Sequence, residues 1–220
     1  MLDPIREQRS DSETALEMLC RAYWKPLYGF ARRRGLDHHT AEEATQEFIL
    51  TLLRRGDLTK VRREHGRFRS FLIVALRRFL INRHERAAAQ KRGGGEELLP
   101  LSDEVQAELA EPDAATLEFD RCWAWQLLEN ALRQLDQEFQ TAQRRAWYAD
   151  LKGFLSDDET NIPRTALAAK HGIGVNAIDV AIHRLRRRYG ELLRALVAQT
   201  VATPAEITEE LRYLTNIMAR

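Results

Sequence analysis

The chain has 220 residues, of which 44% are hydrophobic and 30% charged, and its formal net charge is only +1. This length fits one large or two small domains, and no apolar run approaches the roughly 18–20 residues needed to cross a bilayer. The first residues, MLDPIREQRS, lack the apolar stretch of a secretory signal peptide, so we expect a cytoplasmic protein. The two cysteines, Cys20 and Cys122, lie far apart and are expected to be free thiols.

The small net charge hides a strong division along the sequence. Residues 1–95 contain 20 lysines and arginines against 12 acidic residues, whereas residues 96–120 contain nine acidic residues and no lysine or arginine. Residues 121–220 contain 14 basic and 12 acidic residues. Basic blocks separated by an acidic segment are typical of polyanion-binding modules joined by a linker.

Hydrophobic residues recur at helical spacing along almost the whole chain and no segment alternates convincingly as a strand does, which predicts an all-α fold. In the first block, helices are expected at about 12–34, from Thr40 to just before Gly56, and at about 67–91. Thr40, with Glu43 three residues later, is typical of a capping box. The next stretch, GGGEELLPLSDEVQAELAEPD, combines glycine with acidic residues, so residues 93–115 are predicted to be a flexible acidic linker.

The second block contains further helical patterns. They predict helices near 117–135, 139–151, 163–171 and 175–197, then a short helix at about 204–219 that begins at the Thr203–Pro204 pair. The apolar stripe of this last helix is expected to pack on the second domain, and a regulatory or partner-binding role is the alternative.

The stretch AAKHGIGVNAIDVAIHRLRRRYG, residues 168–190, predicts a helix-turn-helix. Gly172 suits the left-handed turn that ends the first helix, and Ile173 is expected to fill the corner. One buried stripe is predicted in the second helix, formed by Ile178, Ile182, Leu185 and Tyr189.

The other face of this second helix carries the candidate DNA-binding residues. They are Asn176, Asp179, Val180, His183, Arg184, Arg186, Arg187 and Arg188. Such a helix suits DNA recognition, since its first half can meet base edges while its basic end holds phosphate. An amphipathic hairpin with a solvated basic face is the alternative.

Three stretches together resemble one protein family. AEEATQEFILTLL, residues 41–53, resembles the second conserved region of bacterial sigma factors, and GRFRSFLIVALRRFLINRHERAAAQKR, residues 66–92, resembles the promoter-melting segment that follows it. The helix-turn-helix is similar to the last region of the family, which reads the −35 element. In this order they resemble an extracytoplasmic-function (ECF) sigma factor of the sigma-70 family, and the basic helix with its continuation resembles a planctomycete-like subgroup.

The resemblance implies a division of labour between two helical domains. Residues 1–92 would bind core RNA polymerase and −10 DNA, residues 116–197 would bind −35 DNA, and residues 198–220 would be an extension. Implied partners are the clamp helices of the largest polymerase subunit, the flap of the second largest, promoter DNA and, as a further candidate, an anti-sigma protein. Docking on the clamp is implied for Glu43, Gln46, Glu47 and Leu50.

The resemblance also implies individual DNA contacts. Those of the −10 element are Arg67, Arg69, Phe71, Arg77, Arg78, Asn82 and Arg86, with core packing as the alternative for the phenylalanine. Asp179-Val180-Ala181 stands where many relatives carry Lys-Ser-Arg. An aspartate there can accept a hydrogen bond from cytosine, so an unusual promoter preference is expected.

No motif in the sequence predicts catalysis. HExxH, CxxC, GxSxG and Walker patterns are absent, so we expect no enzyme activity, no metal and no cofactor. A stand-alone helix-turn-helix regulator and a helical adaptor protein are the alternatives to a sigma factor. Residues 41–53 and 66–92 favour the sigma factor, because a repressor does not need them.

Overall fold

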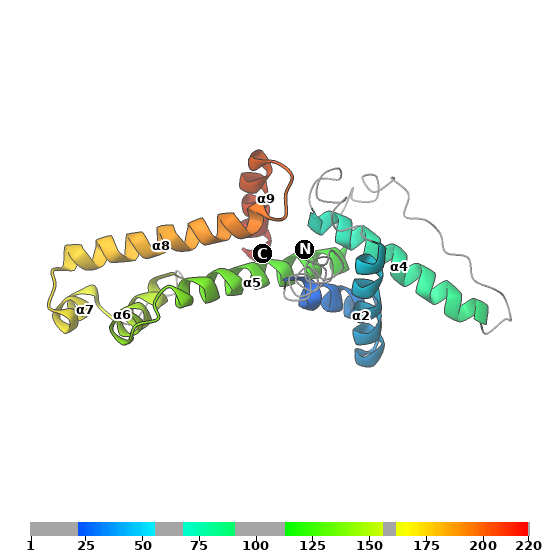
Figure 1. Cartoon of the computed structure of the whole chain (residues 1–220), viewed down its shortest axis with the longest axis horizontal. Helices are drawn as coiled ribbons and strands as arrows, with labels where there is room; N and C mark the ends of the chain where they lie inside the picture. The colour runs from blue at the N-terminus through cyan, green and yellow to red at the C-terminus, as the bar shows by residue number, and fades with distance from the viewer. Residues whose placement is uncertain (1–21, 56–67, 91–112, 156–161, 220) are drawn as a thin grey trace, which may run out of the picture. The chain divides into compact units, whose positions relative to one another are not determined.

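The computed structural model describes residues 22–55, 68–90, 113–155 and 162–219, and within these ranges all regular structure is helical. After a helical segment at 22–33, the elements are α2 (His38–Arg55), α4 (Phe68–Gln90), α5 (Ala114–Gln137), α6 (Ala142–Lys152), the 3₁₀ helix η2 (Gly153–Leu155), α7 (Arg164–His171), α8 (Val175–Ala198) and α9 (Pro204–Met218), as Figure 1 shows. The predicted all-α fold is confirmed. None of the helices in the described ranges is long and apolar enough to span a membrane.

Packing divides the chain into two compact units. The first comprises residues 1–126 and 198–220, and the second comprises residues 127–197. The C-terminal helix α9, which was expected to pack on the second domain, therefore belongs to the first unit, together with residues 116–126 of that predicted domain. The predicted linker also ends earlier than expected, because α5 begins at Ala114. Most of that linker prediction falls outside the described residues.

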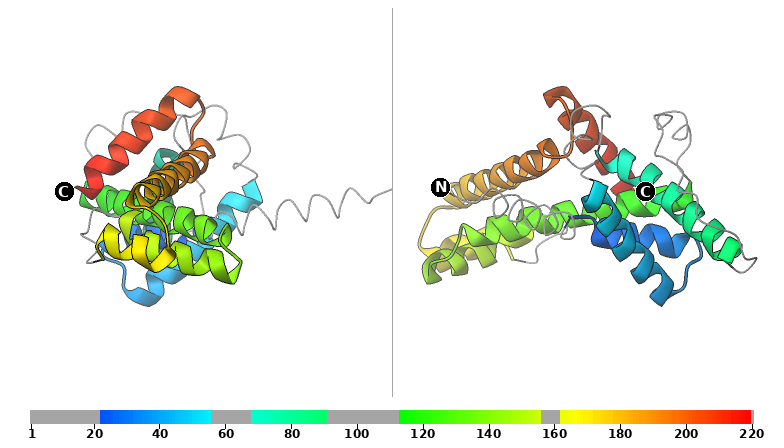
Figure 2. Two further views of the ribbon diagram at one scale, coloured as in Figure 1. Left: turned by 90° about the vertical axis from the view of Figure 1, so that its left-hand side faces the viewer. Right: turned by 45° about the vertical axis from the view of Figure 1, so that its right-hand side comes forward.

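The core of the first unit is formed by the 22–33 segment, α2, α4 and the start of α5. These helices can be told apart by their colours in the right-hand view of Figure 2. Its fully or almost fully buried apolar side chains include Leu27, Phe30, Ala44, Phe48, Leu52, Leu72, Leu76, Phe119 and Trp123. Helices α2 and α4 contact each other, and the rings of Phe48 and Phe79 lie 5.5 Å apart between centroids. The buried residues Ala44, Phe48 and Leu52, which recur at intervals of four, thus mark the buried face of α2.

Helix α2 is capped by Asp37 rather than by the predicted capping box. The Asp37 carboxylate accepts the backbone N–H of Thr40 at 2.9 Å and its hydroxyl at 2.7 Å. These hydrogen bonds lower the pKa of Asp37. Thr40 lies inside the first turn, so the helix starts two residues earlier than its capping-box pattern indicated.

The second unit is held together by one apolar cluster that α5, α6, α7 and α8 share. Its members include Ala131, Leu135, Tyr148, Leu151, Leu167, Ile178, Ile182 and Leu185. At the edge of this cluster the ring of Phe139 stacks on the ring of Tyr148, with 4.7 Å between their centroids. The stripe predicted for α8 is therefore confirmed over its first three members, while Tyr189 is half-buried and donates its hydroxyl to the Leu128 carbonyl.

The turn of the helix-turn-helix is made as its glycine predicted. Gly172 has φ 65°, which is left-handed and suits a residue without Cβ. The N–H of Ile173 returns to the Ala168 carbonyl at 3.0 Å, which closes the end of α7. The Ile173 side chain is 39% exposed, so it does not fill the corner as expected. Leu167 and Ile178 already occupy the interior there.

Candidate docking face and nucleic-acid interface

The four residues predicted to dock on polymerase gather on one exposed face of α2. Glu43, Gln46, Glu47 and Leu50 line a hollow of about 660 Å³. They lie opposite the buried stripe of the same helix, as their spacing predicted. Thr51 and Arg54 of α2 and Arg83 and Arg86 of α4 form the remainder of the lining, so the hollow is bounded by the predicted docking helix and the predicted −10 helix together.

Arg83 of α4 joins the two helices across this hollow. Its guanidinium donates to Glu47 Oε2 at 2.7 Å and to Glu43 Oε2 at 3.2 Å. The docking carboxylates are thus partly neutralised within the chain, and a cationic partner has to compete with Arg83 for them. The sequence did not predict that Arg83 meets the docking carboxylates, because these partners lie 36 and 40 positions away.

Arg69 was predicted to contact DNA, and the structure places it in the interior of the first unit instead. Only 4% of the residue is exposed. Its guanidinium donates to Glu210 Oε1 at 2.7 Å and Oε2 at 3.2 Å, and also to Asp120. It lies over the rings of Trp123 and Tyr213, at 5.6 and 4.6 Å from their centroids. The DNA-contact prediction for Arg69 is therefore corrected, because every face of its head group is occupied.

The buried charges around Arg69 tie three helices together. Burial would lower the pKa of Arg69, but the Asp120 and Glu210 carboxylates outweigh it and raise that pKa. Burial raises the pKa of Asp120, against the opposing effect of Arg69. Burial and the Asp120 carboxylate raise the pKa of Tyr213 to about 12, so its hydroxyl stays a neutral donor to Asp120. Helix α9 is thereby bound to α4 and α5.

Two further members of the predicted −10 set also serve the fold. Phe71 is a buried core residue, which is the alternative that its place on the apolar stripe allowed. Arg77 is largely buried and donates to Asp113 Oδ2 at 3.2 Å, which corrects its assignment to DNA. Burial would raise the pKa of Asp113, but hydrogen bonds from Thr116 and the charges of Arg34 and Arg77 lower it overall. Asp113 in turn caps α5.

The remaining predicted −10 residues share one partly exposed side of α4. Arg78, Asn82 and Arg86 follow one another at intervals of four, which places them in one row. Arg86 donates to the Asn82 carbonyl at 3.3 Å. Ile81 is 52% exposed beside this row. Arg67 lies outside the described residues. The structure thus reduces the predicted set to a short polar row with an apolar neighbour.

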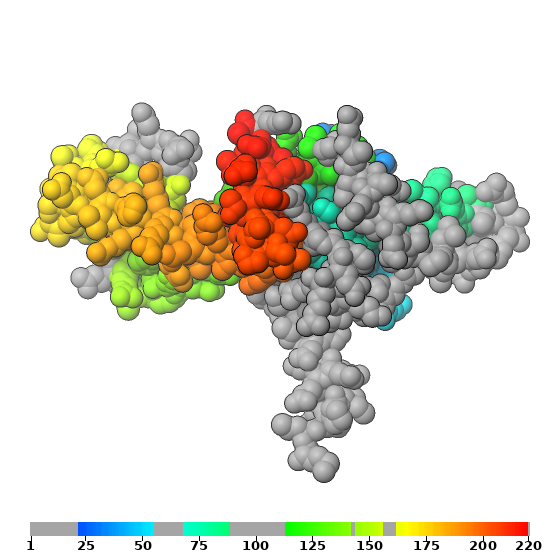
Figure 3. All heavy atoms as spheres, turned by 90° about the horizontal axis from the view of Figure 1, so that it is seen from above, coloured from blue at the N-terminus to red at the C-terminus, as the bar shows by residue number. Residues whose placement is uncertain are grey.

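The predicted −35 residues occupy the solvent face of α8. Asn176, Val180, His183 and Arg187 follow one another by four, three and four positions, opposite the buried stripe. All four are exposed, and the space-filling view in Figure 3 shows α8, in yellow to orange, as an open surface of the second unit. Asp179 lies to one side of this row and pairs with Arg164 of α7 at 3.3 Å. The charge of this carboxylate is therefore partly neutralised within the second unit.

The arginines of α8 differ in what they contact. Arg186 donates to the Phe154 carbonyl at 2.8 Å, and Arg188 pairs with Glu138 at 2.6 Å. Arg187 pairs with Glu191 at 3.0 Å. Within the described ranges Arg184 makes no ion pair or side-chain hydrogen bond. That the run anchors phosphate stays a prediction, and the structure shows that Arg186 also contacts the backbone of η2.

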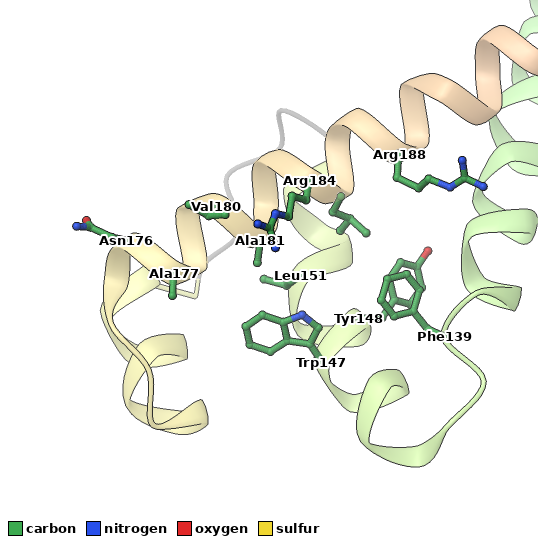
Figure 4. Close-up of a pocket in the computed structure, with 11 residues that line it drawn as sticks. Phe139, Trp147, Tyr148, Leu151, Asn176, Ala177, Val180, Ala181, Arg184 and Arg188 are labelled. Carbon is green, nitrogen blue, oxygen red and sulfur yellow. The ribbon is translucent and has the colours of Figure 1, made fainter.

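A groove of about 730 Å³ separates α6 from α8 in the second unit. Figure 4 shows Trp147, Tyr148 and Phe139 on one side of it and Ala181, Arg184 and Arg188 of α8 on the other. The Tyr148 hydroxyl is buried here, and no residue in the described ranges forms a hydrogen bond with it. Val180 and Asn176 complete the rim on the α8 side, so the groove borders the predicted recognition face. Sequence reasoning did not predict this groove.

No metal site is apparent in the described ranges, where no three histidine, cysteine, aspartate or glutamate side chains are grouped to hold an ion. The searches of curated proteins and of solved structures found no match. The sequence model of the ECF sigma factor family matches residues 3–198. This match covers α2, α4 and α8, whereas α9 lies outside it. The chain therefore belongs to the ECF sigma factor family, whose members are non-enzymatic factors that direct RNA polymerase to initiate transcription at promoters.

Proposed function

We propose that this sigma factor divides promoter contact between its two units. The first unit docks on the clamp helices of the largest polymerase subunit and captures the −10 element. The second unit reads the −35 element and contacts the flap of the second largest subunit. The observation that carries the proposal is the hollow between α2 and α4, which collects all four predicted docking residues beside the helix proposed to hold DNA.

The charge of this hollow supports docking on the clamp. Glu43 and Glu47 are about half exposed and point into a cavity that also holds the Gln46 amide. Carboxylate and amide groups suit an arginine-rich helix, which can form charge-assisted hydrogen bonds with them. Leu50, 40% exposed at the same face, adds apolar area to the contact.

Capture of the −10 strand is proposed for the row Arg78, Asn82 and Arg86. Guanidinium groups hold a phosphate backbone, and an exposed apolar side chain such as Ile81 offers a surface to an unstacked base. Arg83 stands between this row and the docking carboxylates. A polymerase arginine that takes over Glu47 would release Arg83 toward the strand, so docking and strand capture would support each other.

Reading of the −35 element is proposed for the solvent face of α8, with Arg184 holding phosphate. The flap contact is proposed for the aromatic side of the neighbouring groove, where Phe139 and Trp147 offer apolar surface. An anti-sigma protein is a further proposed partner. The subgroup assignment stays a prediction.

The proposal is tested by reconstituting the protein with bacterial core RNA polymerase and measuring run-off transcription. Glu47→Lys should weaken holoenzyme assembly at least about tenfold, because it places like charges in contact at the docking face. Glu42→Lys is the matched control, since this exposed acid lies on α2 but outside the hollow. Equal loss in both variants, or assembly unaffected by Glu47→Lys, contradicts clamp docking through this face.

The same assay separates the alternative of a stand-alone helix-turn-helix regulator. Such a protein retains DNA without polymerase and gives no polymerase-dependent run-off product. The sigma factor should instead form a holoenzyme whose transcription depends on both promoter elements. A product that persists when the −35 element is scrambled but not when the −10 element is scrambled would remove the role proposed for α8.

A further inference from the structure

The solvent-facing row of α8 has an apolar side chain in a position that a merely solvated face does not require. Asn176 precedes Val180 by one turn, and His183 and Arg187 follow it. Val180 is 49% exposed although it lies directly opposite the buried Ile178 and Ile182. A β-branched residue has a lower helix propensity than alanine, and an apolar side chain in contact with water gains no free energy from burial. Val180 therefore does not contribute to the stability of α8.

The groups around Val180 define what can meet it. Arg184, one turn later, makes no ion pair within the described ranges and presents its charge beside the row. Asp179 is held to the side by Arg164 at 3.3 Å, which partly neutralises the only acid on this half of the helix. The surface is therefore an apolar and amide pair bordered by free positive charge, which is complementary to the major groove of a duplex and its phosphates.

We infer that the first half of α8 reads A·T base pairs in the −35 element, through Val180 against a thymine methyl group and Asn176 against adenine. The inference rests on the proposed function. The thymine C5-methyl is the apolar group that base pairs present in the major groove. An asparagine amide matches the N7 acceptor and N6 donor of adenine. The two side chains lie one helical turn apart and address neighbouring base pairs.

This reading differs from the one that the sequence suggested, in which Asp179 accepts a hydrogen bond from cytosine. One oxygen of the Asp179 carboxylate pairs with Arg164 at 3.3 Å, whereas Val180 is 49% exposed. A G·C pair opposite Val180 would place polar base edges against an apolar group without compensation. The valine therefore selects for thymine and against G·C at its position.

The experiment uses the reconstituted holoenzyme and promoter fragments that it recovers from a randomised library. Each thymine of the upstream element is replaced by uracil, which removes only the methyl group. At one position this replacement should weaken promoter binding about fourfold for the unaltered protein, the value expected for one buried methyl. In Val180→Ala the thymine and uracil promoters should bind alike. Val175→Ala is the matched control, because this valine of α8 is 37% exposed on another face.

A second arm tests the amide. Replacement of adenine by 7-deazaadenine removes the N7 acceptor and should weaken binding about tenfold or more at one position, as for a lost bidentate contact. Asn176→Ala should abolish this difference. Melting temperatures of both variants should match the unaltered protein, since both side chains are on the surface.

The outcomes are distinguishable. Recovered promoters that show no thymine–uracil difference at any upstream position overturn the inference and leave the proposed function intact. A Val180→Ala loss that is equal on thymine and uracil promoters also overturns it, and assigns Val180 to a protein contact at the neighbouring groove. If the holoenzyme recovers no promoter or needs no upstream element, the proposed function fails and the inference fails with it.

Discussion

Helices α4 and α8 are both arginine-rich, and the fold uses their arginines to different degrees. In α4, Arg69, Arg77 and Arg83 all pair with acids from outside that helix in the first unit. In α8, Arg188 pairs with Glu138, Arg187 pairs with a residue one turn away on its own helix, and Arg184 makes no ion pair in the described ranges. The comparison teaches that only those arginines of a basic helix that are not held by other residues of the protein are available to bind nucleic acid.

Burial decides how much each kind of pair contributes to stability. The Arg69 head group and both its acids are almost completely inaccessible, so each charge depends on the others to offset its lost hydration. The Arg188–Glu138 pair of the second unit is about 40% exposed on both sides and keeps its water. Substitutions that remove one partner should therefore affect the two units very differently.

The largest effect is expected for Glu210→Ala. The change leaves Arg69 buried with one carboxylate fewer and detaches α9 from α4, so the free energy of unfolding should fall by about 3–5 kcal/mol. Urea unfolding followed by circular dichroism measures this loss. The adjacent Glu209→Ala is the matched control, because Glu209 is exposed on the same helix. A loss below about 1 kcal/mol would mean that α9 is not bound through this network.

A smaller effect is expected for Tyr213→Phe. The substitution removes the neutral hydroxyl that donates to the buried Asp120 carboxylate and keeps the ring over Arg69. A hydrogen bond to a charged group is worth about 1.5–3 kcal/mol, and the free energy of unfolding should fall by about that amount. Tyr148→Phe offers the control, since its buried hydroxyl has no hydrogen-bond partner among the described residues and its removal should cost nothing. Equal losses in both variants would contradict the role of the Asp120 contact.

The arrangement of the helices could be predicted from the sequence wherever the pattern was local. The apolar stripe of α8 and the glycine turn before it were both correct, because helical periodicity and the left-handed conformation are set by neighbouring residues. The cap of α2 was missed since Asp37 and Thr40 are both good capping residues, and only the geometry selects between them.

The fate of individual charges could not be predicted in the same way. Arg69 and Glu210 are 141 positions apart, and nothing in either local pattern indicates that they meet. The docking set on α2 was brought together as predicted because it lies on one helix. The −10 set on α4 was partly lost to the interior because its partners come from α5 and α9. Exposure of a charged side chain is a tertiary property, whereas its position on a helix face is a local one.

The two kinds of arginine in α8 can be separated by DNA binding. Arg184→Ala should weaken holoenzyme binding to promoter fragments of all sequences alike and should lower the slope of affinity against salt concentration by about one. Arg186→Ala should leave that slope unchanged, because the guanidinium already donates to the Phe154 carbonyl. Filter binding over a range of potassium chloride concentrations measures both. Equal slopes in the two variants would contradict the distinction between them.

The smallest effect is expected for Glu138→Ala in the second unit. The hydrogen bond from Arg188 to the Glu138 carboxylate raises the pKa of Arg188. In an exposed pair, however, the attraction between the two charges is largely offset by the contacts with water that each charge gives up. The melting temperature should therefore change by less than about 2 °C. Because the substitution also releases Arg188 beside the recognition face, promoter affinity at low salt should rise slightly while stability stays constant. A large loss of stability would show that this pair resembles the buried Arg69 network, and the contrast between the two units would then not rest on burial.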